Sequence, residues 1–428
     1  MTSEWKKGKI KDFGRIVTGK TPPTARTDFF EGPIPFLTPT DMLDGRKTVR
    51  TSRTLTTVGL ESVKNCLVPK GVAVSCIGWQ MGKTVLINTP TVTNQQINTI
   101  VVDESKFDLS FVYYLLASMR EKIFELGATP TRTPIVNKTT FGEIPIFIPP
   151  FTEQRKIASI GAALDDRITL LRETNQTLES IAQAIFKSWF VDFDPVRAKM
   201  EGRQPEGMDE ETAALFPDSF EESKLGLIPA GWQSKGLDEV ATYLNGLALQ
   251  KFPPTGEDDL PVIKIAQLRK GDSTGADLAA ANIKPEYVVH DGDVLFSWSG
   301  SLEVEIWCGG KGALNQHLFK ITSAQYPKWF FYLWTKHHLQ SFREIAASKA
   351  TTMGHIQRKH LSDAVAIVPC KKVFSDADKV FAPIIDLLIE NALRIRNLSA
   401  IRDTLLPRLI SGQLRLPEAQ EQVEDALS

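Results

Sequence analysis

Two long stretches of the chain carry apolar residues at the spacing of an amphipathic helix. In the first, between Glu153 and Pro195, apolar positions follow one another at steps of three, four or seven residues, which is the period of one helix face. They are Ile157, Ile160, Leu164, Ile168, Leu171, Leu178, Ile181, Ile185 and Trp189. No glycine or proline stands between Gly161 and Pro195. We predict a helix of about 35 residues, which at 1.5 Å per residue would be roughly 50 Å long.

The second stretch, near the C-terminus, repeats the pattern at Leu388, Ala392, Ile395, Leu398, Ile401, Leu405 and Leu409. Pro407 falls in its last turns, and Gly412 stands where a helix would end. A heptad-like stripe on a helix this long needs a partner. We therefore predict an antiparallel, coiled-coil-like pair; the alternative is two unrelated core helices. The predicted interface consists of Ile157, Ile160, Leu164, Leu171, Leu178, Ile181, Leu388, Ile395, Leu398 and Leu405.

Outside these helices the pattern changes to short apolar runs with Gly, Pro and Thr between them, which is typical of short strands and turns. The runs recur in the same order after a shift of roughly 220 residues. For example, KGVAVSCIG from Lys70 matches DGDVLFSWSG from Asp291, and Asn94-Gln95-Gln96 matches Asn315-Gln316-His317. One helical piece is predicted in each copy, around 111–125 and 328–347. The chain is therefore predicted to be a duplicated module.

The predicted fold class is α+β: a tandem duplication of two mixed α/β domains, joined by two long antiparallel helices with pseudo-twofold symmetry. The predicted boundaries are 1–150 for the first domain, 151–198 for the first helix, 199–228 for a linker, 229–370 for the second domain, 371–415 for the second helix and 416–428 for a C-terminal tail. Two similar modules held a fixed distance apart suit a ligand with two separated recognition sites, such as B-DNA. A two-headed protein–protein adaptor fits the same architecture.

Composition narrows the class of protein. The hydrophobic fraction of 42% and the charged fraction of 24% are typical of a soluble globular chain, and no apolar run approaches the length of a membrane span. The four cysteines lie far apart without CxxC spacing, so we expect a cytoplasmic protein. The total charge of −1 hides an uneven distribution: 19 basic and 13 acidic residues over 1–150, against 9 and 15 over 151–228. Different partners for different segments are expected.

The motif census gives no catalytic or metal centre. The Asp194-Pro195 pair is followed by Val196, so the Asn/Asp-Pro-Pro-aromatic loop of an adenine methyltransferase is missing. The stretch from Gly78 to Thr84 has one residue too few between its glycines for a phosphate loop. All six histidines lie in the second module without metal-ligand spacing. We predict no catalytic residue, no metal and no cofactor on this chain.

Residue type indicates the DNA-contact candidates, because phosphates need Lys, Arg and loop amides, while base edges need polar side chains that reach a groove. In the first module they are Lys20, Gln80, Lys83, Arg132 and Lys138. In the second they are Lys251, Arg269, Lys270, Lys349, His355, Gln357, Arg358 and Lys359. The Asn-Gln pairs at 94–95 and 315–316 occupy equivalent positions, for which a shared structural turn is the favoured interpretation over base contact.

Four segments together resemble the specificity (S) subunit of type I restriction-modification systems. They are IPPFTEQRKIASI (148–160), SWFVDFDPVRAKMEG (188–202), GLIPAGWQ (226–233) and LLPRLISGQLRL (405–416). The resemblance implies two target-recognition domains, each reading one half of a split, asymmetric DNA sequence, with helical spacers that set the gap. It also implies a non-catalytic chain that recruits two methyltransferase (M) subunits, which bind S-adenosylmethionine, and two restriction (R) subunits, which use ATP and Mg.

We therefore predict a DNA-recognition subunit whose partners are double-stranded DNA, two M and two R subunits, and not a membrane. The alternative is a two-headed protein–protein scaffold that reads no DNA sequence. An intrinsic methyltransferase or nuclease comes third, because its motifs are missing. The near-neutral second module slightly favours the scaffold.

Overall fold

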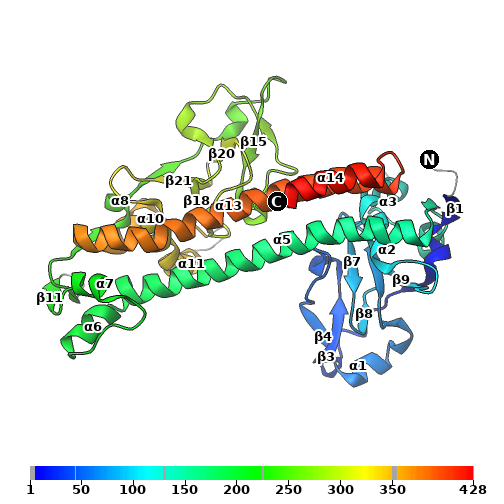
Figure 1. Ribbon diagram of the computed structural model, residues 1–428, viewed down its shortest axis with the longest axis horizontal. Coiled ribbons are helices and arrows are strands. Elements are labelled where there is room, and N and C mark those ends of the chain that lie inside the picture. Colours follow the sequence, from blue (N-terminus) through cyan, green and yellow to red (C-terminus); the bar gives the residue numbers. More distant parts are fainter. Residues whose placement is uncertain (1–4, 44, 129–131, 224–225, 349–353, 428) are drawn as a thin grey trace. The chain divides into compact units, whose positions relative to one another are not determined.

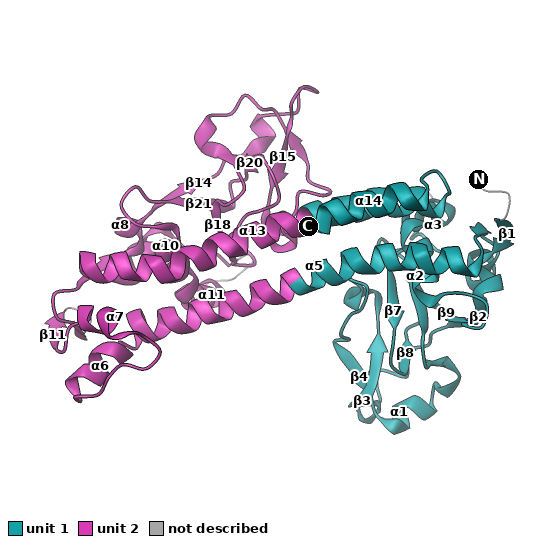
Figure 2. Cartoon of the chain, viewed as in Figure 1, with its two compact units in different colours: residues 1–170, 397–428 teal, residues 171–396 magenta. Residues whose placement is uncertain are grey.

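The computed structural model describes residues 5–43, 45–128, 132–223, 226–348 and 354–427. The chain divides into two compact units (Figure 2). Unit 1 comprises residues 1–170 and 397–428, and unit 2 comprises residues 171–396. Each unit contains one mixed domain of sheets and short helices, together with parts of the two long helices α5 (Phe151–Phe186) and α13 (Lys371–Ile410) (Figure 1).

Unit 1 is built on two four-stranded sheets and one strand pair. The first sheet is antiparallel, with the order β2 (Gly14–Thr18), β9 (Ile97–Val102), β6 (Gly71–Ser75), β7 (Thr84–Ile87). The second has the order β4 (Arg53–Leu55), β3 (Phe30–Leu37), β8 (Thr91–Thr93), β5 (Leu67–Val68), and its β3–β8 pair is parallel. The pair is β1 (Lys6–Lys9) with β10 (Pro145–Ile148). Its short helices are α1 (Thr57–Glu61), α2 (Leu109–Ser118), α3 (Arg120–Gly127) and α4 (Lys138–Gly142).

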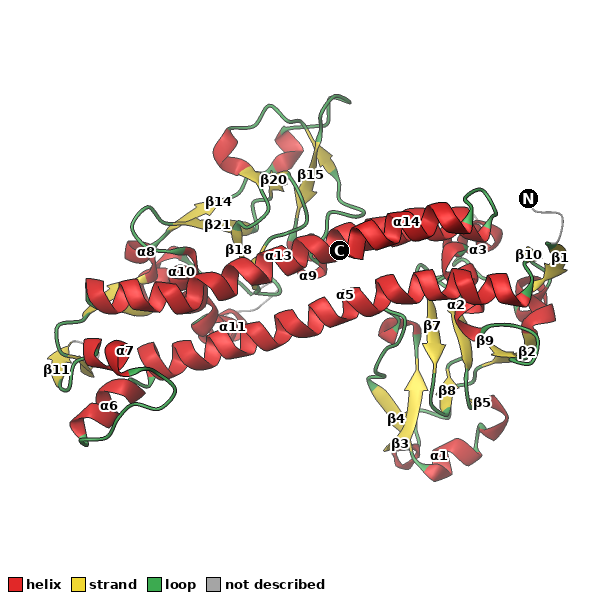
Figure 3. Cartoon of the chain, in the orientation of Figure 1, coloured by secondary structure: helices red, strands yellow, loops and turns green. Residues whose placement is uncertain are grey.

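Unit 2 repeats this plan strand for strand, and Figure 3 shows strands and short helices mixed in both domains. Its first sheet has the order β14 (Thr242–Asn245), β21 (Leu318–Thr322), β18 (Val294–Ser297), β19 (Val304–Ile306). Its second has the order β16 (Leu278–Ala279), β15 (Leu260–Ile263), β20 (Gly312–Leu314), β17 (Val288–Val289), again with one parallel pair, β15–β20. The strand pair is β13 (Gln233–Gly236) with β22 (Val365–Val368). Its helices are α8 (Leu237–Val240), α9 (Ile265–Lys270), α10 (Lys328–His337), α11 (Leu339–Ser348) and α12 (Arg358–Asp363).

This matching strand order confirms the predicted duplication and the α+β class. The short apolar runs form strands that are buried on both faces: every residue of β6 and of β18 is buried. The two helical pieces predicted in the modules are each split into two helices, α2 with α3 and α10 with α11.

Within unit 2 the two long helices run antiparallel. The Asn391 side-chain amide donates to the Asn175 side-chain oxygen at 2.8 Å, and the Phe186 and Phe381 ring centroids lie 6.4 Å apart. Position 175 therefore faces position 391 while position 186 faces position 381. Within unit 1 the same two helices meet where the Arg402 guanidinium donates to the Asp165 carboxylate at 2.8 Å.

Most of the residues predicted for the helix interface are removed from water. Ile157, Ile160, Leu164, Leu171, Leu398 and Leu405 are buried, and Leu178, Leu388 and Ile395 are half-buried. Ile181 differs, because 43% of its surface is exposed. Its neighbour Ala182 takes the inward position and is 1% exposed, followed four residues on by the buried Phe186. Because a straight helix has about 3.6 residues per turn, a heptad stripe of apolar residues rotates gradually around it. At this point the inward-facing position has shifted by one residue, from 181 to 182.

The helix predicted over 151–198 ends earlier. α5 stops at Phe186, a wider π turn follows over Lys187–Val191, and α6 (Asp194–Met200) begins after a break. Phe193 adopts a left-handed conformation at the break, with φ of 58°, and Pro195 then stands in the first turn of α6, where its missing N–H is tolerated. The corresponding left-handed residue after α13 is Gly412, with φ of 72°.

The segments predicted as linker and tail are also structured. The linker contains α7 (Glu210–Leu215) and the hairpin β11 (Phe220–Ser223) with β12 (Gly226–Pro229), and its Phe216 is buried in the aromatic core of unit 2. The tail forms α14 (Leu416–Leu427), which buries Ala419 and Val423. Short 3-10 turns complete the fold at Ile10–Phe13, Thr27–Phe29, Pro39–Asp41, Lys64–Cys66, Leu249–Lys251 and Pro285–Tyr287.

Candidate nucleic-acid interface

In each unit, several loops leave the first sheet at the same end. In unit 1 the register pairs Thr18 with Asn98 and Ser75 with Ile97, so the ends of β2 and β6 lie beside the start of β9. An isolated bridge between Ile77 and Ile135 adds the segment before α4. We call the segments 19–29, 76–83, 94–96 and 132–137 the sheet-end loops of unit 1.

Unit 2 gathers the equivalent loops in the same way. Asn245 pairs with Phe319, Ser297 pairs with Leu318, and the isolated bridge joins Ser299 to His355. The sheet-end loops of unit 2 are therefore 246–259, 298–303, 315–317 and 354–357.

Glycine fixes the first of these loops in both units. The Gly19 amide donates to the Ile97 carbonyl, and a Cβ on Gly19 would lie 2.1 Å from the Thr93 carbonyl oxygen. Gly246 makes the equivalent bond, to Leu318, and its Cβ would lie 2.2 Å from the Asn315 carbonyl oxygen. No larger residue fits such a close backbone approach, so both units send the chain across the sheet end along the same path.

The paired Asn-Gln motifs form a shared turn, as the sequence favoured. The Asn94 side-chain oxygen accepts from the Gln96 amide at 3.0 Å, and the Asn315 oxygen accepts from the His317 amide at 3.2 Å. Each asparagine is buried and holds the loop in place. The residues that follow in each turn, Gln96 and His317, are only half-buried.

The candidates of the first module lie at this sheet end or, in the case of Lys138, directly after it. Lys20, Arg132 and Lys138 are exposed. Lys83 is held differently, because its ammonium donates to the Met42 carbonyl at 2.9 Å. Gln80 is half-buried, and its side-chain oxygen has no hydrogen-bond partner among the described residues.

In the second module, five of the candidates lie at the sheet end or directly after it. His355, Gln357 and Lys359 are exposed, and so is Lys251 in the first loop. The Arg358 guanidinium donates to the Tyr243 carbonyl at 3.5 Å and lies 5.9 Å from the centre of the Phe319 ring. Arg358 and Lys138 are the first residues of the equivalent helices α12 and α4. Lys349 lies outside the described residues.

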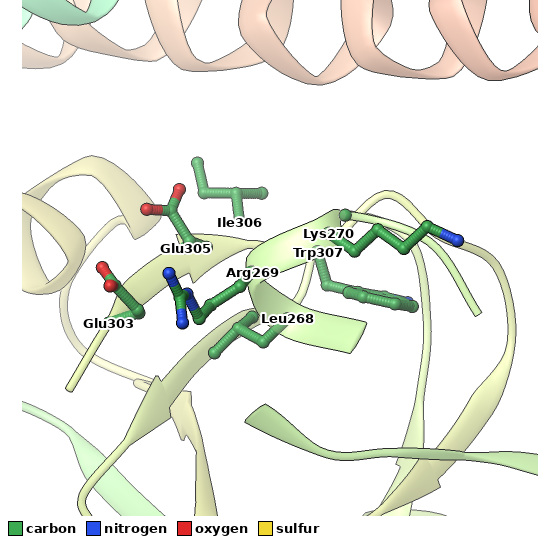
Figure 4. A pocket seen from close by; sticks show the side chains of 8 residues that line it. Leu268, Arg269, Lys270, Glu303, Glu305, Ile306 and Trp307 are labelled. Atoms are coloured by element: carbon green, nitrogen blue, oxygen red, sulfur yellow. The ribbon is translucent and has the colours of Figure 1, made fainter. Parts of the chain in front are cut away.

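Arg269 and Lys270 are not in the sheet-end loops. They end α9 and line a pocket with Glu303, Glu305 and Trp307 (Figure 4). The Arg269 guanidinium points toward the two carboxylates, while Lys270 points away from them (Figure 4) and pairs with Asp272 at 3.1 Å. Burial raises the pKa of Glu305. A phosphate would meet carboxylates in this pocket, so these two residues are poor candidates for backbone contacts.

Sequence reasoning missed a hydrogen-bonded aromatic cluster at the unit 2 sheet end. The Trp298 indole N–H donates to the Asn245 side-chain oxygen at 2.9 Å, and its ring lies 5.9 Å from the His317 ring. His317 Nδ1 in turn lies 3.0 Å from the Ser299 hydroxyl. The repeat alignment was the available signal, because Trp298 directly follows the matched strand end at Ser297.

The sheet-end loops present hydrogen-bond donors and polar side chains. Among the described residues, no three His, Cys, Asp or Glu side chains lie close enough together to hold a metal ion. Within the same residues, no helix combines the length and apolar character that a membrane crossing requires. Exposed Lys and Arg beside Asn, Gln, His and Trp are the side chains that contact phosphates and base edges.

Comparisons with known proteins assign most of the chain to one family. The family model described as the type I restriction modification DNA specificity domain matches residues 2–180 and 229–400. The type I restriction enzyme MjaIX specificity subunit of Methanocaldococcus jannaschii is 26% identical over 430 residues, covering 97% of this chain and 94% of the relative. The HindI specificity subunit of Haemophilus influenzae is 27% identical over 353 residues, covering 71% and 77%.

The fold is also similar to a solved structure. The crystal structure of the S subunit of a type I restriction-modification system from M. genitalium superimposes with a TM-score of 0.51 and covers 96% of this chain and 97% of that chain. At 16% sequence identity this likeness concerns the fold alone.

Proposed function

The chain belongs to the type I restriction-modification DNA specificity family, and from this premise we propose that its two sets of sheet-end loops each read one half of a bipartite, asymmetric DNA target. The chain itself is a specificity subunit; the division of labour between its units is the proposal. It would act in the cytoplasm, where it meets its DNA.

The proposal rests mainly on the sheet-end loops, which have the same backbone framework in both units but carry different side chains. The asparagine turns and the close glycine approaches are the same in both units. A basic residue recurs at one equivalent position, as Lys138 and Arg358. The half-buried position after the turn holds Gln96 in unit 1 and His317 in unit 2. Shared basic residues suit the uniform phosphate backbone, while differing polar residues suit different base sequences.

The long helices are proposed to set the gap between the half-sites and to dock two M subunits. Support comes from apolar side chains that these helices leave in water: Leu170 is 53% exposed, Ile181 43% and Leu387 40%. Exposed apolar residues on a helix are a usual feature of protein–protein contact surfaces. The exposure of Ile181, unexpected for a residue of the helix pair, fits this second role.

Catalysis is proposed to reside in the partners. The M subunits would bind S-adenosylmethionine and methylate adenine, and two R subunits would use ATP and Mg to move and cleave DNA. This chain would bind none of these cofactors and would contribute only the recognition of the DNA sequence. The family assignment supports this division, because it describes a specificity domain.

Methylome sequencing of cells that express this chain with its M subunit tests the proposal. The expected result is a bipartite N6-methyladenine motif that disappears when this chain is deleted. Unchanged methylation after deletion would refute it and would favour a two-headed scaffold. The variant Asn315→Ala disrupts the turn of unit 2 alone. Only the half of the methylated motif that unit 2 reads should then change.

A further inference from the structure

A tryptophan on the sheet-end loops of unit 1 faces water. Trp79 is 80% exposed, although tryptophan is on average among the more buried residues. One side of its ring packs loosely on Phe124, with ring centroids 6.1 Å apart. Ile135, bridged to the same loop through Ile77, is 57% exposed. An apolar surface that protrudes from a polar loop set usually meets a partner.

The backbone of the loop that carries this indole is held in place. The Ser75 amide donates to the Lys83 carbonyl at 2.9 Å and the Gly82 amide donates to the Ser75 carbonyl at 2.8 Å, which closes the loop at its base. Gly78 and Gly82 both have positive φ angles, of 86° and 84°. A Cβ on Gly82 would lie 2.7 Å from the Arg120 carbonyl oxygen, so the loop is packed directly on α3. A partner can therefore bind Trp79 without first ordering the loop, which lowers the entropic cost of binding.

The charge around Trp79 favours a polyanion as that partner. Three of the sheet-end loops of unit 1, 76–83, 94–96 and 132–137, contain Lys83 and Arg132 but no Asp or Glu, and Lys138 follows them directly. The fourth loop, 19–29, has one acidic residue, Asp28, which pairs with Arg26 at 2.6 Å. The neighbouring helix α3 is balanced, with two basic and two acidic residues. A surface that combines exposed cations with an exposed aromatic ring is the usual composition of a nucleic-acid site.

The equivalent loop of unit 2 is different. Gly78 and Gly300 occupy the same place, since their amides donate to the equivalent carbonyls of Pro134 and Gly354. The residue after Gly300 is Ser301, where unit 1 has Trp79. The tryptophan of that loop, Trp298, is instead half-buried and bonded to Asn245. A contact made by Trp79 would therefore belong to one half of the target alone.

We propose that Trp79 contacts the half-site read by unit 1, with its indole packed against a thymine methyl group in the groove rather than on the sugar–phosphate backbone. This inference rests on the proposed function and adds a specificity-determining residue to it. Apolar contact with the thymine methyl is a means of direct readout of duplex DNA.

The test uses the chain assembled with its M subunits and measures binding to the cognate duplex and to duplexes with single substitutions in either half. Trp79→Ala is expected to weaken cognate binding about tenfold, equivalent to ~1.4 kcal/mol, and Trp79→Phe to retain most of the affinity. In the Trp79→Ala complex, substituting the contacted base should cause no further loss of affinity. This insensitivity should be confined to one half of the target. Val58→Ala is the matched control, because Val58 is 55% exposed on α1, outside the sheet-end loops.

Three results would overturn the inference. Trp79→Ala could bind every duplex as the unsubstituted complex does. It could lose affinity equally for cognate and scrambled duplexes, which would place the indole on the backbone. It could fail to assemble with M subunits while Val58→Ala assembles, which would place Trp79 in a protein interface. If the unsubstituted complex itself does not discriminate between duplexes, the proposed function fails and this inference falls with it.

Discussion

A buried ion pair in unit 1 should make an unusually large contribution to stability. Arg402 on α13 donates to Asp165 on α5 at 2.8 Å, and their side chains are only 11% and 8% exposed. The Tyr114 hydroxyl donates to the other Asp165 oxygen at 2.8 Å. Burial, and then the charge of Asp165, raise the pKa of Tyr114, so this hydroxyl keeps its proton and donates. Both long helices are thereby tied to α2.

Replacing Arg402 with Met would leave the Asp165 charge buried with only the tyrosine as a partner. Removing one member of a buried pair costs about 3–5 kcal/mol, and the remaining Tyr114 bond places the expected loss near the lower end, at about 3 kcal/mol. For a unit of this size, such a loss corresponds to a fall in the melting temperature of roughly 6–12 °C. Urea unfolding followed by tryptophan fluorescence measures the free energy directly.

Lys70→Met provides the matched control. Lys70 and Glu104 form an ion pair of 2.7 Å in the same unit, but their side chains are 46% and 50% exposed. Its loss should cost about 1 kcal/mol or less. Adding Asp165→Asn to Arg402→Met should recover at least ~1 kcal/mol, because the unpaired charge is gone. If Arg402→Met and Lys70→Met lower the free energy of unfolding equally little, burial does not determine the contribution of the Arg402–Asp165 pair, and the reasoning is wrong.

Three further changes test other contacts. An added methyl at Gly161 would lie 2.6 Å from the Tyr114 ring, so Gly161→Ala should lower the free energy of unfolding by about 1–3 kcal/mol, measured in urea; a stabilised variant would contradict this contact. Asn391→Ala leaves the Asn175 oxygen without its donor and should cost about 1–2 kcal/mol, whereas the exposed Asn397→Ala should change stability by less than ~0.5 kcal/mol. Burial lowers the pKa of His338 below 6.5, so the unfolded chain binds more protons. The contribution of this residue to stability is therefore present above pH 6.5 and lost on acidification. His338→Gln should reduce, without abolishing, the fall of the urea unfolding midpoint between pH 7 and pH 5, because burial also lowers the pKa of the neighbouring His337, to about 4.

The hydrophobic pattern was sufficient for the architecture. The three-four spacing located α5 and α13 because each helix buries one face over most of its length, and the recurring short runs located two equivalent sets of strands. The pattern could not place Ile181, since a position at the margin of the stripe is buried or exposed according to the partner opposite it. It also could not locate the break at Phe193, where a bulky residue adopts the backbone conformation that Gly412 adopts after α13.

The candidate site was predicted by residue type and only partly by position. Lys20 is separated from Arg132 and Lys138 by over a hundred residues, and they reach one sheet end because β2 and β6 flank β9 and Ile135 bridges to Ile77. No sequence pattern indicated that Arg269 faces Glu303 and Glu305 across a pocket (Figure 4), because these carboxylates lie more than thirty residues further along the chain. Trp79 and Trp298 occur in similar Gly-rich surroundings, yet one is exposed and the other is bonded to Asn245. Only the tertiary contacts distinguish them.

The central claim is that each unit reads its own half of the target, and exchanging one equivalent residue tests it most directly. Gln96 and His317 occupy the same position of the shared turn. Methylome sequencing should show that Gln96→His changes one half of the bipartite motif and that His317→Gln changes the other, with the gap unaltered. A variant that changes both halves, or a pair of variants that alters the same half, would contradict the account.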